Sequence, residues 1–99
     1  MCFNSKGNNK IVSLPKEFFA LENLTQLFLY GNGIMMVQEE IVQLKNLCTL
    51  ALSNNCLMEV PMQLKKLTKL TSLTLYDNPC LNKEELEELG TLLNMDLCN

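Results

Sequence analysis

The chain has 99 residues, 47% of them apolar and 19% charged, with a formal net charge of −3 at pH 7. This length and apolar content suit one domain with a hydrophobic core. Arginine is absent and the lysines are scattered, which argues against a nucleic-acid partner because such a partner needs a clustered basic face. Histidine is also absent, so we expect no enzyme, no metal site and no cofactor.

No apolar run approaches the ~20 residues that a membrane-spanning helix needs. The start, MCFNSKGNNK, lacks the apolar core of a secretory signal. We therefore expect no membrane insertion and a cytoplasmic location, although a mature secreted protein would also have lost its signal. The odd number of cysteines favours reduced thiols. The rival interpretation is a bridge between Cys80 and Cys98 in a secreted protein, and both alternatives stay open.

In chain order, residues 1–10 come first, and they carry little of the apolar pattern that follows. When that pattern is projected backwards, Asn4 and Lys6 fall where later segments have strand leucines. We predict that this segment is a degenerate N-terminal lid, which would leave the strand Leu27–Leu29 at the edge of the sheet. An exposed edge strand invites strand addition, so we also predict a homodimer or another stack through this end.

Residues 11–81 contain three copies of one pattern, and Asn32, Asn55 and Asn78 mark its 23-residue period. Each asparagine follows a leucine-rich run: LENLTQLFLYGNGI, LKNLCTLALSNNCL and LTKLTSLTLYDNPC. A period of this length is typical of a stacked-repeat solenoid. The expected core positions are Ile11, Leu14, Phe18, Leu21, Leu24, Leu27 and Leu29, then Ile34, Val37, Ile41, Leu44, Leu47, Leu50 and Leu52, then Leu57, Val60, Leu64, Leu67, Leu70, Leu73 and Leu75.

Each repeat combines two local periodicities. The Leu-x-Leu pieces at 27–29, 50–52 and 73–75 alternate with period two, which predicts strands. The apolar residues before each strand recur every three positions, which suits a short helix or 3₁₀ turns. One coil is therefore predicted to contain a strand and a tight helical return, stacked on its neighbours because no repeat buries its apolar row alone.

Residues 82–99 are predicted to form a helical cap over the third repeat. Asn82 offers an N-cap, with Glu85 three residues later as in a capping box. One apolar helical face follows, made by Leu86, Leu89 and Leu93. Gly90 is predicted to interrupt or end the first part of this helix. The whole chain, 1–99, is thus predicted to be a single domain.

The pattern resembles that of the leucine-rich repeat family, LxxLxLxxNxL, over residues 9–81. Leu14-Pro15 and Val60-Pro61 resemble the LPxxLxxLxxL return of the 23-residue class found in intracellular Ras-suppressor and scaffold proteins. The resemblance implies an α/β solenoid with a parallel sheet on its concave face and short helical or 3₁₀ returns on its convex face. It also implies that the repeated asparagines form a structural ladder to backbone groups at the turns, through Asn32, Asn55 and Asn78.

Two departures from the family pattern stand out. Gln38 takes the place of proline in the second repeat, and Cys80 takes the last leucine position of the third. Neither should disturb the fold, since buried cysteine behaves as a small apolar residue. We expect both Cys56 and Cys80 to pack against the core.

Strand residues that alternate with the core leucines are expected to face solvent and to bind a protein or peptide. They are Gln26, Phe28, Tyr30, Thr49, Ala51, Ser53, Ser72, Thr74, Tyr76 and Asp77. Parallel strands lie ~4.8 Å apart, so Tyr30 and Tyr76 should stand roughly 10 Å apart across Ser53. Tyrosine is frequent at interface hot spots. The alternative is that aromatic residues and threonine simply suit strands.

The predicted function is a non-enzymatic protein–protein interaction module, an adaptor or an inhibitor. One alternative is a structural protein that assembles with itself through its open N-terminal edge. A weaker alternative is a secreted recognition or effector domain.

Overall fold

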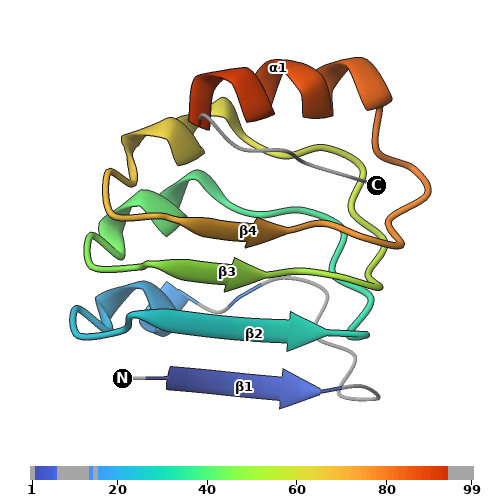
Figure 1. Cartoon of the computed structure of the whole chain (residues 1–99). Helices are drawn as coiled ribbons and strands as arrows, with labels where there is room; N and C mark the ends of the chain where they lie inside the picture. The colour runs from blue at the N-terminus through green and yellow to red at the C-terminus, as the bar shows by residue number, and fades with distance from the viewer. Residues whose placement is uncertain (1, 7–13, 15, 94–99) are drawn as a thin grey trace.

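The repeats form a solenoid whose strands make one parallel sheet (Figure 1). The computed structural model describes residues 2–6, 14 and 16–93. The strands are β1 (Cys2–Lys6), β2 (Gln26–Tyr30), β3 (Thr49–Ala51) and β4 (Ser72–Thr74). The returns are the 3₁₀ helices η1 (Lys16–Ala20), η2 (Glu39–Gln43) and η3 (Met62–Lys66), and the α-helix α1 (Lys83–Leu93) follows β4. The predicted parallel sheet, 3₁₀ returns and C-terminal helix are confirmed.

Equivalent leucines lie side by side in neighbouring strands. Leu27 in β2 is in register with Leu50 in β3, and Leu50 is in register with Leu73 in β4. All three side chains are buried. The 23-residue period is therefore the length of one coil, and it places each apolar position directly on its counterpart in the coil before.

The core consists mainly of the predicted apolar positions. Those that the structure describes are buried, apart from the half-buried Leu21, while Ile11 lies outside the described residues. Phe19, Leu81, Leu86 and Leu89 extend the same cluster. Each repeat thus contributes one layer to a continuous core, as its apolar row requires.

The N-terminal segment differs from the prediction. Residues Cys2–Lys6 form β1, which pairs in parallel with β2 along its whole length. The prediction that the strand Leu27–Leu29 forms the sheet edge is therefore wrong, because β1 occupies that edge (Figure 1). Residues 7–10 of the predicted lid lie outside the described residues.

The register of β1 explains why the backward projection failed. The projection assumed an offset of 23 residues and so placed Asn4 opposite Leu27. In the structure Phe3 lies opposite Leu27 and Ser5 opposite Leu29, an offset of 24 residues (27 − 3). A shift of one residue exchanges the two faces of a strand. The segment therefore pairs in a frame that the 23-residue period does not reveal.

A side-chain cap begins α1. The Asn82 Oδ1 atom accepts hydrogen bonds from the backbone N–H groups of Glu84, at 2.7 Å, and Glu85, at 3.4 Å. These N–H groups belong to the first turn of the helix, where they have no partner within the helix itself. The structure thus confirms the N-cap predicted at Asn82.

The apolar face of α1 packs on the last coil. Leu86 and Leu89 are buried, and the half-buried Leu93 lies against the same core. The helix continues through the buried Gly90, so the predicted interruption at this residue is wrong. Contacts between α1 and η3 position the helix over the third repeat (Figure 1).

Replacing Asn82 with alanine should lower the free energy of unfolding by about 1 kcal/mol, because two N–H groups lose their acceptor. Urea denaturation followed by circular dichroism measures this change. Lys83→Ala is the control, since it alters the neighbouring exposed residue and leaves the cap in place. Equal losses in the two variants would contradict a specific capping role.

The positions of two cysteines also correct the sequence interpretation. Cys56 and Cys80 are exposed, so the prediction that they pack is wrong. Leu81 is buried in the position expected for Cys80, and its N–H donates to the Asn78 carbonyl at 3.0 Å. The described cysteines are free thiols, and Cys98 lies outside the described residues.

Candidate partner-binding face

The side chains that alternate with the core leucines form the outer face of the sheet, which we call the sheet face. The strand register arranges them in rows across the repeats. The first row is Gln26, Thr49 and Ser72, and the second is Phe28, Ala51 and Thr74. Backbone hydrogen bonds continue past the strands, from Gly31 N–H to the Ser53 carbonyl at 3.2 Å and from Asn54 N–H to the Tyr76 carbonyl at 2.7 Å. These bonds bring Tyr30, Ser53 and Tyr76 into a third row.

Aromatic rings stand at both ends of this third row. Phe28 and Tyr30 stack within β2, with ring centroids 6.1 Å apart and an interplanar angle of 27°. Tyr76, in the third repeat, is 51% exposed. Sequence reasoning placed Tyr30 and Tyr76 on opposite sides but did not foresee the stacking of Phe28 on Tyr30. That stacking makes one broad apolar wall from two side chains.

Ala51 does not lie where a contact residue should. It is only 2% exposed, so its prediction as a partner-contacting residue is wrong. Its register neighbours Phe28 and Thr74 both carry larger side chains. Ala51 therefore forms part of the floor of the sheet face. The nearby Thr74 Oγ1 atom is also buried and has no hydrogen-bond partner within the described part of the chain.

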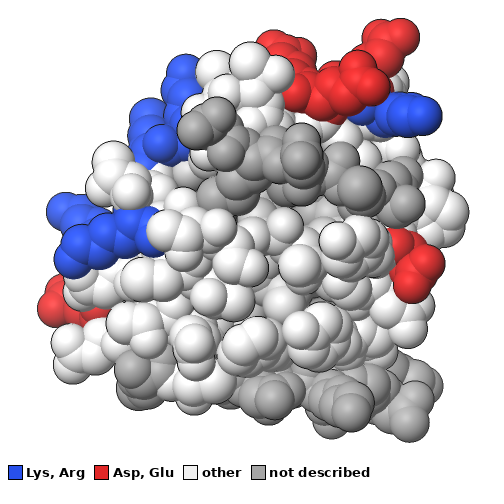
Figure 2. All heavy atoms as spheres, viewed as in Figure 1, with Lys and Arg blue, Asp and Glu red and all other residues white. Residues whose placement is uncertain are grey.

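The charged side chains lie at the margins of this view of the molecule (Figure 2). Most of the lysine surface lies on the side where the strands begin, next to some acidic surface, and most of the acidic surface lies over α1, next to some lysine surface, and on the side where the strands end. Between them, the described surface is uncharged. Of the predicted contact residues only Asp77 carries a charge, and it is exposed beyond the end of β4. The sheet face therefore offers apolar surface and hydroxyl groups.

The repeated asparagines are buried at the turn that follows each strand. The Asn55 Oδ1 atom accepts from the N–H groups of Asn32, at 2.9 Å, and Ile34, at 3.1 Å. Its Nδ2 atom donates to the Leu29 carbonyl of the preceding coil at 2.7 Å, and also to the Leu52 and Ser53 carbonyls of its own coil. Asn78 repeats this arrangement with Leu57 N–H and the Leu52, Leu75 and Tyr76 carbonyls. An amide suits the site because it both donates and accepts.

The residue before each of these asparagines adopts a left-handed backbone. The φ angles are 63° at Gly31, 58° at Asn54 and 59° at Asp77. Glycine, asparagine and aspartate tolerate this conformation better than other residues. Asp77 therefore has a role in the turn itself, in addition to its predicted place in the binding site.

Within the described residues, no three cysteine, aspartate or glutamate side chains come close enough together to hold a metal ion. None of the described helices has the length and apolar character needed to cross a membrane.

Neither a protein-family model nor a curated protein matches the chain. A solved structure of a leucine-rich repeat protein from Leptospira interrogans is similar over 94% of this chain, with a TM-score of 0.84 and 36% sequence identity. The match covers 24% of that protein's chain, so the present chain spans about a quarter of its length. The chain therefore has a leucine-rich repeat fold. This fold supports a role as a protein-interaction module in general terms.

Proposed function

We propose that the chain is a non-enzymatic adaptor or inhibitor that binds a segment of a protein partner across its sheet face. The observation that carries this proposal is the solvent-facing row of Tyr30, Ser53 and Tyr76, with Phe28 stacked on Tyr30. Exposed aromatic rings next to small polar residues are typical of interface hot spots, because a ring buries a large area and tyrosine keeps a polar tip.

The chemistry of the face defines the kind of segment that it would bind. An apolar side chain of the partner would lie over Ser53, between the rings of Tyr30 and Tyr76. Hydroxyl groups beside it offer hydrogen bonds to a peptide backbone: Thr49, Ser53 and Ser72. Since the middle of the described face is uncharged, the central part of the bound segment should be uncharged too.

Replacing both Tyr30 and Tyr76 with alanine should weaken partner binding at least about 30-fold, which corresponds to about 2 kcal/mol for one hot spot. The partner is first captured with the wild-type chain from a native lysate, and its affinity for each variant is then measured by calorimetry. The control replaces Met58 and Leu92 with alanine, since these exposed apolar residues lie outside the predicted site.

Unchanged affinity in a folded Tyr30→Ala/Tyr76→Ala variant would contradict the proposed site. Recovery of the chain bound only to further copies of itself would instead favour the second candidate, self-assembly. One observation supports that candidate: within the described residues, β1 is the terminal strand of the sheet and has a strand neighbour on one side only. The cytoplasmic location stays a prediction.

A further inference from the structure

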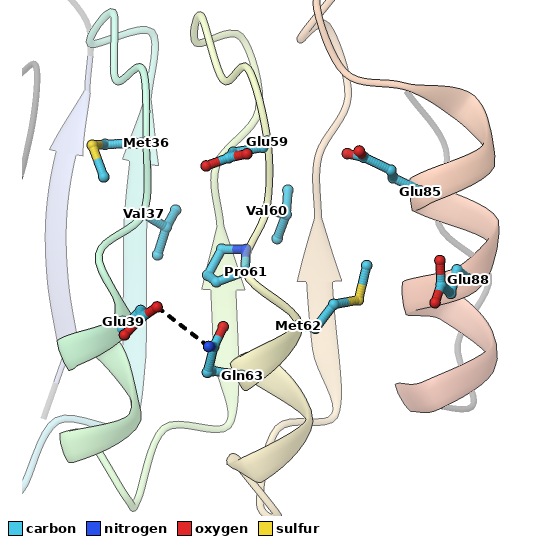
Figure 3. A pocket seen from close by; sticks show the side chains of 10 residues that line it. All are labelled: Met36, Val37, Glu39, Glu59, Val60, Pro61, Met62, Gln63, Glu85 and Glu88. Atoms are coloured by element: carbon cyan, nitrogen blue, oxygen red, sulfur yellow. Dashed lines mark hydrogen bonds between the residues drawn. The ribbon is translucent and has the colours of Figure 1, made fainter.

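A second concave surface lies among the returns, away from the sheet face (Figure 3). It is a shallow groove of about 500 Å³ that crosses from the segment after β2, over η3, to α1. Its lining residues are Met36, Val37, Glu39, Glu59, Val60, Pro61, Met62, Gln63, Glu85 and Glu88. Residues from two successive returns and the terminal helix thus share one surface.

The middle of the groove is apolar. Val37 and Val60 are buried beneath it, and Pro61 lies between them and the returns (Figure 3). Met36 is 48% exposed, and the half-buried Met62 lies toward α1. Methionine is unbranched and polarisable, so it adapts to apolar groups of different shapes.

Two further exposed methionines lie next to groove residues along the chain. Met35 and Met58 are both exposed, and the Met58 N–H donates to the Met35 carbonyl at 3.1 Å, so these residues lie on adjacent coils. Met35 directly precedes the groove residue Met36, and Met58 directly precedes Glu59. Exposed methionines therefore flank the groove residues along the chain on two adjacent coils.

Carboxylates surround the apolar middle on several sides. They come from η2, from the segment before η3 and from α1: Glu39, Glu59, Glu85 and Glu88 (Figure 3). Among these four described glutamates, only Glu39 has a side-chain hydrogen bond to another lining residue, accepting from Gln63 Nε2 at 3.3 Å. None of the described lining residues is a lysine. The negative charge of the groove therefore comes from carboxylates on three separate segments of the chain.

We propose that this groove binds a basic amphipathic peptide segment of a protein partner. The segment would place apolar side chains on the methionines, valines and Pro61, and lysine or arginine side chains beside the glutamates. Methionine-rich grooves accept such segments because the apolar contacts are adaptable and the charges are complementary. The site is separate from the sheet face, so the chain could hold this segment while a second one occupies the sheet.

The test uses a short synthetic helical peptide of leucine and lysine with a fluorescent label, titrated with the full chain by fluorescence anisotropy. Replacing Glu59 and Glu88 with glutamine should weaken binding about tenfold, since two partly desolvated charge pairs are lost. The matched control is Glu17→Gln/Glu87→Gln, which removes the same charge outside the groove. Met36→Ser should also weaken binding, whereas Met58→Ser, outside the lining, should have a smaller effect.

Several results would overturn the proposal. If the Glu59→Gln/Glu88→Gln variant and its control lose affinity equally, the peptide responds only to net charge. If a peptide with glutamate in place of lysine binds as tightly, the carboxylates are not the recognition element. The Tyr30→Ala/Tyr76→Ala variant should keep its affinity for the basic peptide, so failure here and failure of the sheet-face site are distinguishable.

Discussion

Replacing Asn55 with alanine should lower the free energy of unfolding by about 3–5 kcal/mol, since buried polar groups would lose their partners at an estimated 1–3 kcal/mol each. The side chain is almost fully buried, and it serves two N–H groups and three carbonyls. Alanine provides neither a donor nor an acceptor, and the small space that it leaves would not restore all of these bonds.

Urea denaturation of Asn55→Ala, followed by circular dichroism, measures the loss. The control is Asn46→Ala, which removes a half-buried asparagine whose two hydrogen bonds are exposed: it donates to the Glu22 carbonyl and accepts from Lys69 Nζ. Water can replace those bonds, so the control should lose less than about 1 kcal/mol. A loss of that size in Asn55→Ala as well would show that the buried amide is dispensable.

Leu50→Ala should destabilise the protein to a similar extent, by about 3–5 kcal/mol, through lost apolar burial and the cavity left behind. Leu50 is 0% exposed, and its strand β3 lies between β2 and β4. Neighbouring coils contribute Leu27 and Leu73 in the same register. The free energy of unfolding of a domain is typically only about 5–15 kcal/mol, so this single change would remove a large part of it.

Thermal and urea unfolding of Leu50→Ala should therefore show an earlier midpoint than the wild type. Leu92→Ala is the matched control, because it makes the same chemical change at a side chain that is 47% exposed. It should cost less than about 1 kcal/mol. Equal losses in the two variants would mean that the stacked leucines are not the main source of stability.

The interior of the fold could be predicted because its determinants repeat. Each buried leucine has a counterpart one period away, so the sequence indicates both the strand and its register. Residues in the first and last coils have a neighbouring repeat on one side only, so the period constrains them less. At the N-terminus the offset is 24 residues, and the 23-residue rule therefore assigned the wrong frame to Asn4 and Phe3. At the other end, Leu81 is buried in the position where the rule placed Cys80.

The candidate site was only partly predictable. Alternation along a strand identifies the outward residues, but the exposure of each depends on the size of its neighbours, so Ala51 is covered. The groove among the returns escaped sequence reasoning for another reason. Met36 and Glu59 occupy equivalent positions in successive repeats yet differ chemically, and Glu85 comes from the terminal helix. A surface assembled from unlike residues leaves no periodic signal.

The hydrogen bonds of Asn55 and Asn78 also bear on how such a chain can change in length. Each amide joins its own coil to the coil immediately before it, through Leu29 and Leu52 respectively. A duplicated stretch of one period would include its own asparagine, which would form the same hydrogen bonds to the preceding coil. Gain or loss of whole coils would therefore preserve these bonds, whereas an insertion between the amide and the strand carbonyls that it joins would disturb them.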